Sequence, residues 1–423
     1  MFRTTVIFIT VCLLCSVVQA QQSFAEKLVL PQPDCEQKAI SGIKKITIVI
    51  PDDSNGVDEY AKWWESVFKS RDCEASIKTE SMLQQEDLNG DLLILGPIGS
   101  FLQWGRFGMP LKKLEHGFSI GKYILTDIAC GFSYASPPGT TPVRLAKIGN
   151  SFNAYKQVVN MPFFAFEFIV LNNAVPEFIG NGSLVDMNAL KETLYTPKES
   201  KYYTFMISNN LSDEDTKEIN DTEFDKYDIH AEAFVKRMEL NLPEKKIKTY
   251  IHATQEEIKY FSGSFGGLCG GTTYGFVAGD EIHSWKMGGA IKHEANHHLF
   301  NQQINKMAAT FLNEGIQKWY EYSISEEDKA KGFEKAIEIA DYDLSEVICG
   351  KENFFQGDKY YLVSGIFTDY LIETYGLNKF KELYKYEALE ILSGFEKTYN
   401  KPLSLVLEDY KKWLHIKPYN QNQ

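Results

Sequence analysis

The chain has 423 residues, which exceeds the usual size of a single hydrophobic core and predicts two domains. Hydrophobic residues make up 44% and charged residues 24%, a balance typical of folded globular proteins that argues against long disorder. The formal net charge is −13 and the sequence contains no obvious basic patch. Because phosphate groups would be repelled, this charge argues against a general nucleic-acid or anionic-membrane binder.

Residues 1–20 predict a secretory signal peptide. Arg3 precedes an apolar run from Val6 to Cys15, and Val18-Gln19-Ala20 fits a small-residue cleavage site. The alternative is a membrane anchor, but the run is shorter than the roughly 20 residues that span a bilayer. We therefore expect a secreted or periplasmic protein with no integral membrane segment after cleavage.

Cysteine use is compatible with export but does not define a disulfide framework. An exported chain can form disulfides, and the mature sequence keeps five widely scattered cysteines. Their spacing is not that of a cysteine zinc site, and their pairing cannot be deduced from sequence. These cysteines are Cys35, Cys73, Cys130, Cys269 and Cys349.

After a polar leader, 21–41, residues 42–199 predict a small α/β domain. KKITIVIP (44–51) indicates a buried strand, and VDEYAKWWESVFKS (57–70) has the apolar spacing of an amphipathic helix. GDLLILGPIG (90–99) indicates another strand, so we expect a partly parallel sheet. FFAFEFIVLNNAVPEFIGN (163–181) resembles a hairpin. No motif in this half indicates a function.

We place a domain boundary near residue 200, followed by a mainly helical domain over 200–415 and a tail over 416–423. KIKTYIHA (246–253) predicts a strand, and the helix after it has Thr254 as its N-cap and Glu257 at the capping-box position. YGFVAGDEIHSW (274–285) is β-like, and the chain from Met287 onward predicts helices almost throughout.

The segment AIKHEANHHL contains the pattern H-E-x-x-H, formed by His293, Glu294 and His297. On a helix, residues four apart lie on the same face, so both imidazoles can reach one metal ion. Zinc binds histidine nitrogen readily, and a catalytic zinc keeps three protein ligands and a water. The alternative is an amphipathic helix whose histidines are solvated or satisfied in the core. Glu314, in the second helical segment ATFLNEGIQKWYEY, favours the zinc site because it offers a third ligand.

HEANHHLF followed by FLNEGIQKWYE resembles the gluzincin metallopeptidases of the thermolysin-like MA clan, and the resemblance covers about residues 200–415. It implies that His293, His297 and Glu314 bind Zn²⁺ and that Glu294 is the general base. YYLVSGIFTDYLIETYG (360–376) is similar to the helix that follows the active site in this group. This similarity implies that Tyr361 donates a hydrogen bond to the oxyanion, with Tyr360 as the competing candidate.

The same resemblance gives YGFVAGDEIHSW the role of an edge strand that pairs with extended substrate backbone. We do not expect His283, in this strand, or His298, beside the motif, to be metal ligands. The expected fold class is α+β: a mainly helical, zincin-like catalytic domain preceded by a smaller α/β domain.

The expected function is that of a secreted zinc-dependent peptidase acting on a peptide or protein substrate. Two alternatives remain open: an exported zincin-fold binding protein without catalysis, and a zinc hydrolase acting on a non-peptide bond. The sequence does not define cleavage specificity, endopeptidase or exopeptidase action, or oligomeric state.

Overall fold

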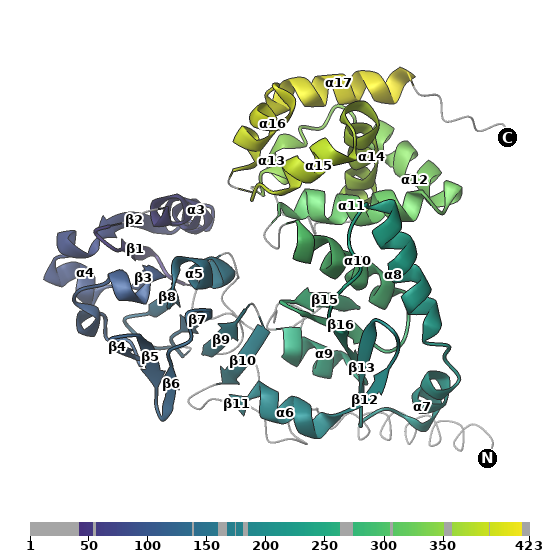
Figure 1. Ribbon diagram of the computed structural model, residues 1–423. Helices are drawn as coiled ribbons and strands as arrows, with labels where there is room; N and C mark the ends of the chain where they lie inside the picture. Colours follow the sequence, from purple (N-terminus) through teal and green to yellow (C-terminus); the bar gives the residue numbers. More distant parts are fainter. Residues whose placement is uncertain are drawn as a thin grey trace, which may run out of the picture. The chain divides into compact units, whose positions relative to one another are not determined.

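The structure is a computed structural model that describes residues 42–53, 56–137, 139–159, 167–173, 175–180, 185–262, 274–304, 308–350, 358–388 and 390–416 (Figure 1). The predicted signal peptide, the leader and residues 417–423 of the tail lie outside the described residues. The fold is mixed α+β, with a sheet-rich N-terminal part and a helical C-terminal part. None of the described helices combines the length and the apolar character needed to cross a membrane.

The chain forms two compact units that are interleaved along the sequence. The first contains the chain up to Lys198, Phe205–Thr222 and Lys248–Gly288. The second contains Glu199–Thr204, Glu223–Ile247 and the chain from Gly289 onward. The predicted domain boundary near residue 200 stays a prediction. The H-E-x-x-H segment belongs to the second, mainly helical unit.

The first unit is built on an eight-stranded mixed sheet. Its order is β11-β10-β9-β7-β8-β3-β1-β2. The four strands from β8 to β2 are parallel, as the alternation of strand and helix patterns predicts, and the other four pair antiparallel. The strands are β1 (Lys45–Ile50), β2 (Glu74–Thr79), β3 (Leu92–Pro97), β7 (Cys130–Ala135), β8 (Arg144–Gly149), β9 (Phe168–Asn172), β10 (Val175–Gly180) and β11 (Val185–Asp186).

Both faces of this sheet are buried, which explains the continuous apolar runs of its parallel strands. In β3, Leu93 and Leu95 contribute to the core with α3 (Val57–Lys69) and α5 (Phe152–Val159). Leu92 and Ile94 point to the opposite face. That face packs against α4 (Gln85–Asn89) and a small sheet of β4 (Lys112–Leu114), β5 (Gly117–Ile120) and β6 (Tyr123–Leu125).

A five-stranded sheet has the order β12-β13-β14-β16-β15. The YGFVAGDEIHSW segment, expected to be an edge strand, forms two strands: β15 lies at the edge, whereas β16, which carries His283, lies inside the sheet between β14 and β15. Thr254 Oγ1 accepts the backbone N–H of Glu257 at 3.0 Å, which confirms the predicted N-cap. The Glu257 carboxylate accepts the N–H of Ala253. The elements are β12 (Tyr195–Glu199), β13 (Tyr203–Ser208), β14 (Ile247–His252), β15 (Gly275–Ala278), β16 (Glu281–Trp285), α6 (Met187–Leu194), α7 (Asp213–Asn220) and α9 (Gln255–Ser262).

The second unit consists mainly of helices, as the sequence predicts from Met287 onward (Figure 1). Two of them, α11 and α14, approach closely at glycines: a Cβ on Gly315 would lie 2.4 Å from Thr368 Oγ1, and one on Gly365 would lie 2.5 Å from Lys318 Cβ. The helices are α8 (Asp225–Arg237), α10 (Gly289–Gln303), α11 (Thr310–Tyr322), α12 (Glu326–Glu338), α13 (Ser345–Ile348), α14 (Asp358–Tyr375), α15 (Leu377–Tyr384), α16 (Ile391–Tyr399) and α17 (Leu403–Ile416).

Candidate metal centre

The H-E-x-x-H residues lie in the middle of α10, so His293 and His297 are one helical turn apart. Their Nε2 atoms are 3.0 Å from each other. Helix α8 packs along α10, and His230 Nε2 lies within hydrogen-bond distance of Asn296 Oδ1 at 2.9 Å. The helical period therefore aligns the two imidazoles, and α8 supports the helix that carries them.

Helix α11 brings the third predicted ligand to the same point. Glu314 Oε2 is 3.3 Å from His293 Nε2 and 3.4 Å from His297 Nε2. This carboxylate oxygen is buried and has no hydrogen-bond partner within the described residues. The three residues named as ligands from the sequence, His293, His297 and Glu314, thus come together in a group that could hold a metal ion. Metal binding itself stays a prediction.

The spacing of these three atoms fits a tetrahedral zinc site. Zinc binds histidine nitrogen at about 2.0–2.1 Å and carboxylate oxygen at about 2.0–2.2 Å, which places neighbouring ligand atoms of a tetrahedron roughly 3.3–3.5 Å apart. The observed separations of 3.0, 3.3 and 3.4 Å lie close to this range. The side chains therefore need little movement to bind the ion.

The outer nitrogen of each imidazole has its own acceptor. His293 Nδ1 lies 3.1 Å from Glu321 Oε1, and His297 Nδ1 lies 3.0 Å from Asn313 Oδ1. A carboxylate only accepts hydrogen bonds, so His293 donates through Nδ1. In the neutral tautomers that these partners favour, both Nε2 lone pairs converge with the Glu314 carboxylate. Three acceptors that meet in one place suit a cation, and metal-bound histidines typically donate their other ring N–H to acceptors of this kind.

The charges within the group shift the pKa values of its members. Burial alone would lower the pKa of His293, but Glu314 and Glu321 raise it to about 10. Burial alone would raise the pKa of Glu314, but the two imidazoles lower it to about 2. The two carboxylates thus favour a proton on the His293 imidazole, and a metal ion bound here would replace that proton.

Glu294, the predicted general base, is half-buried on α10. Burial raises the pKa of its carboxyl above the ordinary value, although the imidazoles of His297 and His293 act in the opposite direction. A carboxylate with a raised pKa accepts a proton more readily, which suits a general base.

Tyr361 is half-buried near the start of α14, where its carbonyl oxygen accepts a hydrogen bond from Ser364 Oγ at 2.8 Å. Tyr360 beside it is fully buried. The role of Tyr361 at an oxyanion stays a prediction.

A tyrosine that was not predicted from the sequence contacts Asn313, the residue beside His297 Nδ1. The buried hydroxyl of Tyr384, at the end of α15, lies within hydrogen-bond distance of Asn313 Oδ1 and Asn301 Oδ1, and its single proton can be donated to either. Glu321 and Asn313 were missed as well. Glu321 lies seven residues after Glu314 and therefore on the same face of the helix, so this spacing could have identified it as a neighbour of the site. Tyr384 has no local sequence signal that connects it with the histidines.

Two other histidines were not expected to bind metal. His298 is buried and is not a member of the metal-ligand group. His283 is fully buried in β16, where its Nδ1 lies 2.9 Å from His252 Nε2 and its ring stacks on Phe276. His252 Nδ1 in turn contacts the Tyr195 hydroxyl at 2.8 Å. His283 therefore has a hydrogen-bonding partner, His252, and a packing partner, Phe276, within the first unit.

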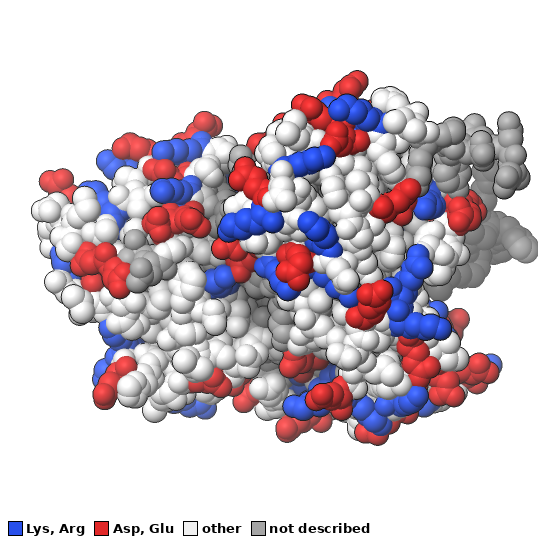
Figure 2. Space-filling view, turned by 45° about the horizontal axis from the view of Figure 1, so that its top comes forward, with Lys and Arg blue, Asp and Glu red and all other residues white. Residues whose placement is uncertain are grey.

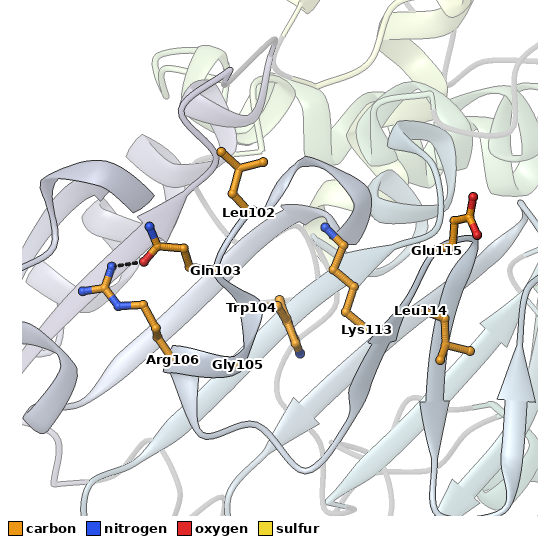
Figure 3. A pocket seen from close by; sticks show the side chains of 8 residues that line it. All are labelled: Leu102, Gln103, Trp104, Gly105, Arg106, Lys113, Leu114 and Glu115. Atoms are coloured by element: carbon orange, nitrogen blue, oxygen red, sulfur yellow. Dashed lines mark hydrogen bonds between the residues drawn. The ribbon is translucent and has the colours of Figure 1, made fainter.

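The first unit also has an open hollow of about 600 Å³ beside β4 (Figure 3). Arg106 donates to the Gln103 side chain at 2.5 Å, and the Lys113 ammonium donates to the carbonyl oxygens of Gly99 and Phe101. Leu102 at its rim is 82% exposed. Only two cations line this hollow, together with the carboxylate of Glu115, so we assign no ligand to it.

No protein-family model matches the chain, and no curated protein sequence matches it.

Proposed function

We propose that the protein is a zinc-dependent peptidase of the gluzincin type that hydrolyses peptide bonds. The observation that carries the proposal is the convergence of His293 Nε2, His297 Nε2 and Glu314 Oε2 within 3.4 Å of one another. Export through the N-terminal signal peptide is part of the same proposal.

In this mechanism the chain contributes a fixed ligand set and a proton carrier. His293, His297 and Glu314 would hold a zinc ion, which would polarise the scissile carbonyl and lower the pKa of its water toward about 7. Glu294 accepts a proton from the attacking water and then delivers it to the leaving amine. Glu321 and Asn313 hold the imidazoles in the tautomer that leaves Nε2 unprotonated.

The test begins with zinc content, measured by elemental analysis on the purified native chain and on Glu314→Ala. About one zinc per native chain, lost or strongly weakened in the variant, is expected because catalytic zinc sites use three protein ligands. A folded native chain that takes up no zinc when the metal is supplied would end the proposal.

A digest of a mixed peptide library then tests the reaction. Cleavage that depends on zinc and on Glu294 supports a peptidase. Zinc binding without cleavage of any peptide would favour the two alternatives, a binding protein or a hydrolase of another bond.

A further inference from the structure

The helical unit has a hollow of its own, which is lined by several lysines. It has a volume of about 440 Å³ and lies between α15, the turn after it, α16 and the residue that follows α10. Four lysines and one glutamate contribute to its lining. We call it the lysine pocket; its cations are Lys379, Lys381, Lys385 and Lys397.

Two of these lysines are held in place by backbone carbonyls. Lys379 Nζ donates to the carbonyl oxygen of Thr398 at 2.9 Å, near the end of α16. Lys381 Nζ donates to that of Glu239 at 3.2 Å, just after α8. Carbonyls at helix C-termini attract cations but do not neutralise them. Each ammonium has three donors, so both lysines keep donors for another acceptor.

The other two lysines add charge at the same place. Lys397 lies over the Tyr386 ring, 5.6 Å from its centroid. Lys385 pairs with Glu382 at 2.8 Å, and both side chains are more than half exposed, so this pair is weak. Within the described residues no carboxylate lies at ion-pair distance from Lys379, Lys381 or Lys397.

In the lysine pocket, four lysines share one hollow with a single glutamate. On the face shown in Figure 2, Lys and Arg alternate with Asp and Glu, as in the many pairs such as Lys331 with Glu327. This cluster is not visible as a basic patch in the sequence, because Lys397 is separated from the three lysines of α15 and its following turn. Folding brings the four together in a chain whose net charge is −13.

We propose that the lysine pocket binds a phosphate-class dianion, either free phosphate or the phosphate group of a phosphomonoester. Lysine acts on phosphate as a point charge, and several lysines around a small hollow suit a compact dianion with many acceptor oxygens. Tyr386 and Ile304 add apolar surface to the lining. Burial lowers the pKa of Lys381, so a bound anion would also stabilise its charged form.

The test is calorimetric titration of the full-length mature chain at constant ionic strength with inorganic phosphate, glycerol phosphate and vesicles containing phosphatidic acid. We expect saturable binding of both soluble phosphates. Lys381→Gln should weaken their Kd about tenfold or more, since it removes a charge-assisted hydrogen bond. Lys381→Gln also removes a contact to the end of α8 and could disturb the fold. The double variant Lys385→Gln/Lys397→Gln is therefore tested as well, and it too should weaken phosphate binding about tenfold or more.

Lys412→Gln is the matched control. Lys412 is an exposed lysine on α17 outside the pocket, so its replacement removes the same charge from another part of the surface. Its Kd should stay within about twofold of the native value if binding is site-specific. Glu314→Ala should also keep phosphate binding, which separates this site from the metal centre and makes the two proposals fail independently.

Absence of saturable phosphate binding, or equal weakening in Lys412→Gln, would overturn the proposal. So would binding to the vesicles alone, because the soluble phosphate group would then not be the ligand. Tighter binding of glycerol phosphate than of inorganic phosphate would support the phosphomonoester as the natural form.

Discussion

Glu321 Oε1 lies 3.1 Å from Nδ1 of His293, and this contact orients the imidazole whose Nε2 faces Glu314. Lys318 pairs with the other oxygen of the same carboxylate at 2.6 Å. We predict that Glu321→Gln lowers zinc affinity about 10–100-fold, the usual effect of losing an outer partner of a metal-bound histidine. Competition with a fluorescent zinc chelator measures this.

Glu338→Gln is the control for that experiment, because Glu338 is an exposed carboxylate on α12 that pairs with Lys335. Its zinc affinity should equal that of the native chain. Unchanged affinity in Glu321→Gln would mean that this contact does not orient a metal ligand.

Glu294→Gln separates metal binding from catalysis. The amide keeps the size of the side chain but cannot accept the proton of the attacking water. We expect the variant to bind zinc like the native chain and to lose about 10²–10⁴-fold in kcat, the range of general acid–base catalysis.

His297→Ala should instead lose the zinc, because it removes one of the three ligands. Zinc content and peptide-hydrolysis rates of both variants check the two expectations together. Retained full activity in Glu294→Gln would contradict the proposed role of this carboxylate.

Gly315→Ala tests the close packing of α11 against α14. The added Cβ would lie 2.4 Å from Thr368 Oγ1 and 2.8 Å from the Ser364 carbonyl oxygen. We expect a loss of about 1–3 kcal/mol in the free energy of unfolding, which is typical of overpacking. Zinc occupancy should fall as well, because the neighbouring Glu314 moves with α11. Gly288→Ala, where a Cβ meets nothing within 4 Å, is the control in thermal and urea unfolding.

Because His283 is buried, we predict that the free energy of unfolding depends on pH. Burial lowers its pKa from 6.5 to about 4, against the opposing effect of Glu281, while Lys191 also lowers it. Below pH 6.5 the unfolded chain binds a proton that the folded chain does not, so stability falls as the pH drops from 6.5 to 4. The slope is about 1.4 kcal/mol per pH unit for one proton.

Urea unfolding of the native chain and of His283→Leu at several pH values between 7.5 and 4 measures this slope. The variant should show a shallower loss of stability. His116→Leu is the control, because His116 is exposed and its replacement should leave the slope unchanged. Equal slopes in all three chains would contradict the assignment to His283.

Local sequence patterns were sufficient to predict much of the secondary structure of this protein. The spacing of His293 and His297 follows from the helical period, and Glu294 comes with it. The buried runs of β1 and β3 predicted a partly parallel sheet, because strands covered on both faces must be apolar throughout. Thr254 identified the start of α9 because a cap is a contact between near neighbours in the chain.

Long-range contacts were beyond these patterns. No spacing rule joins Tyr384 to Asn313, or Lys397 to Lys379, since each pair meets through the packing of separate helices. The interleaving of the two units also depends on which segments share a core, and hydrophobic periodicity within one segment carries no information about its partner.

The sequence by itself determined the element types, the candidate ligand residues and the candidate base, because these depend on period, capping and residue chemistry within a few helical turns. The tertiary structure decided that the ligand atoms converge to 3.0–3.4 Å, which acceptors hold the imidazoles, and that four lysines surround one hollow. These features arise when distant segments pack, and a distance between packed helices is set by the side chains of both.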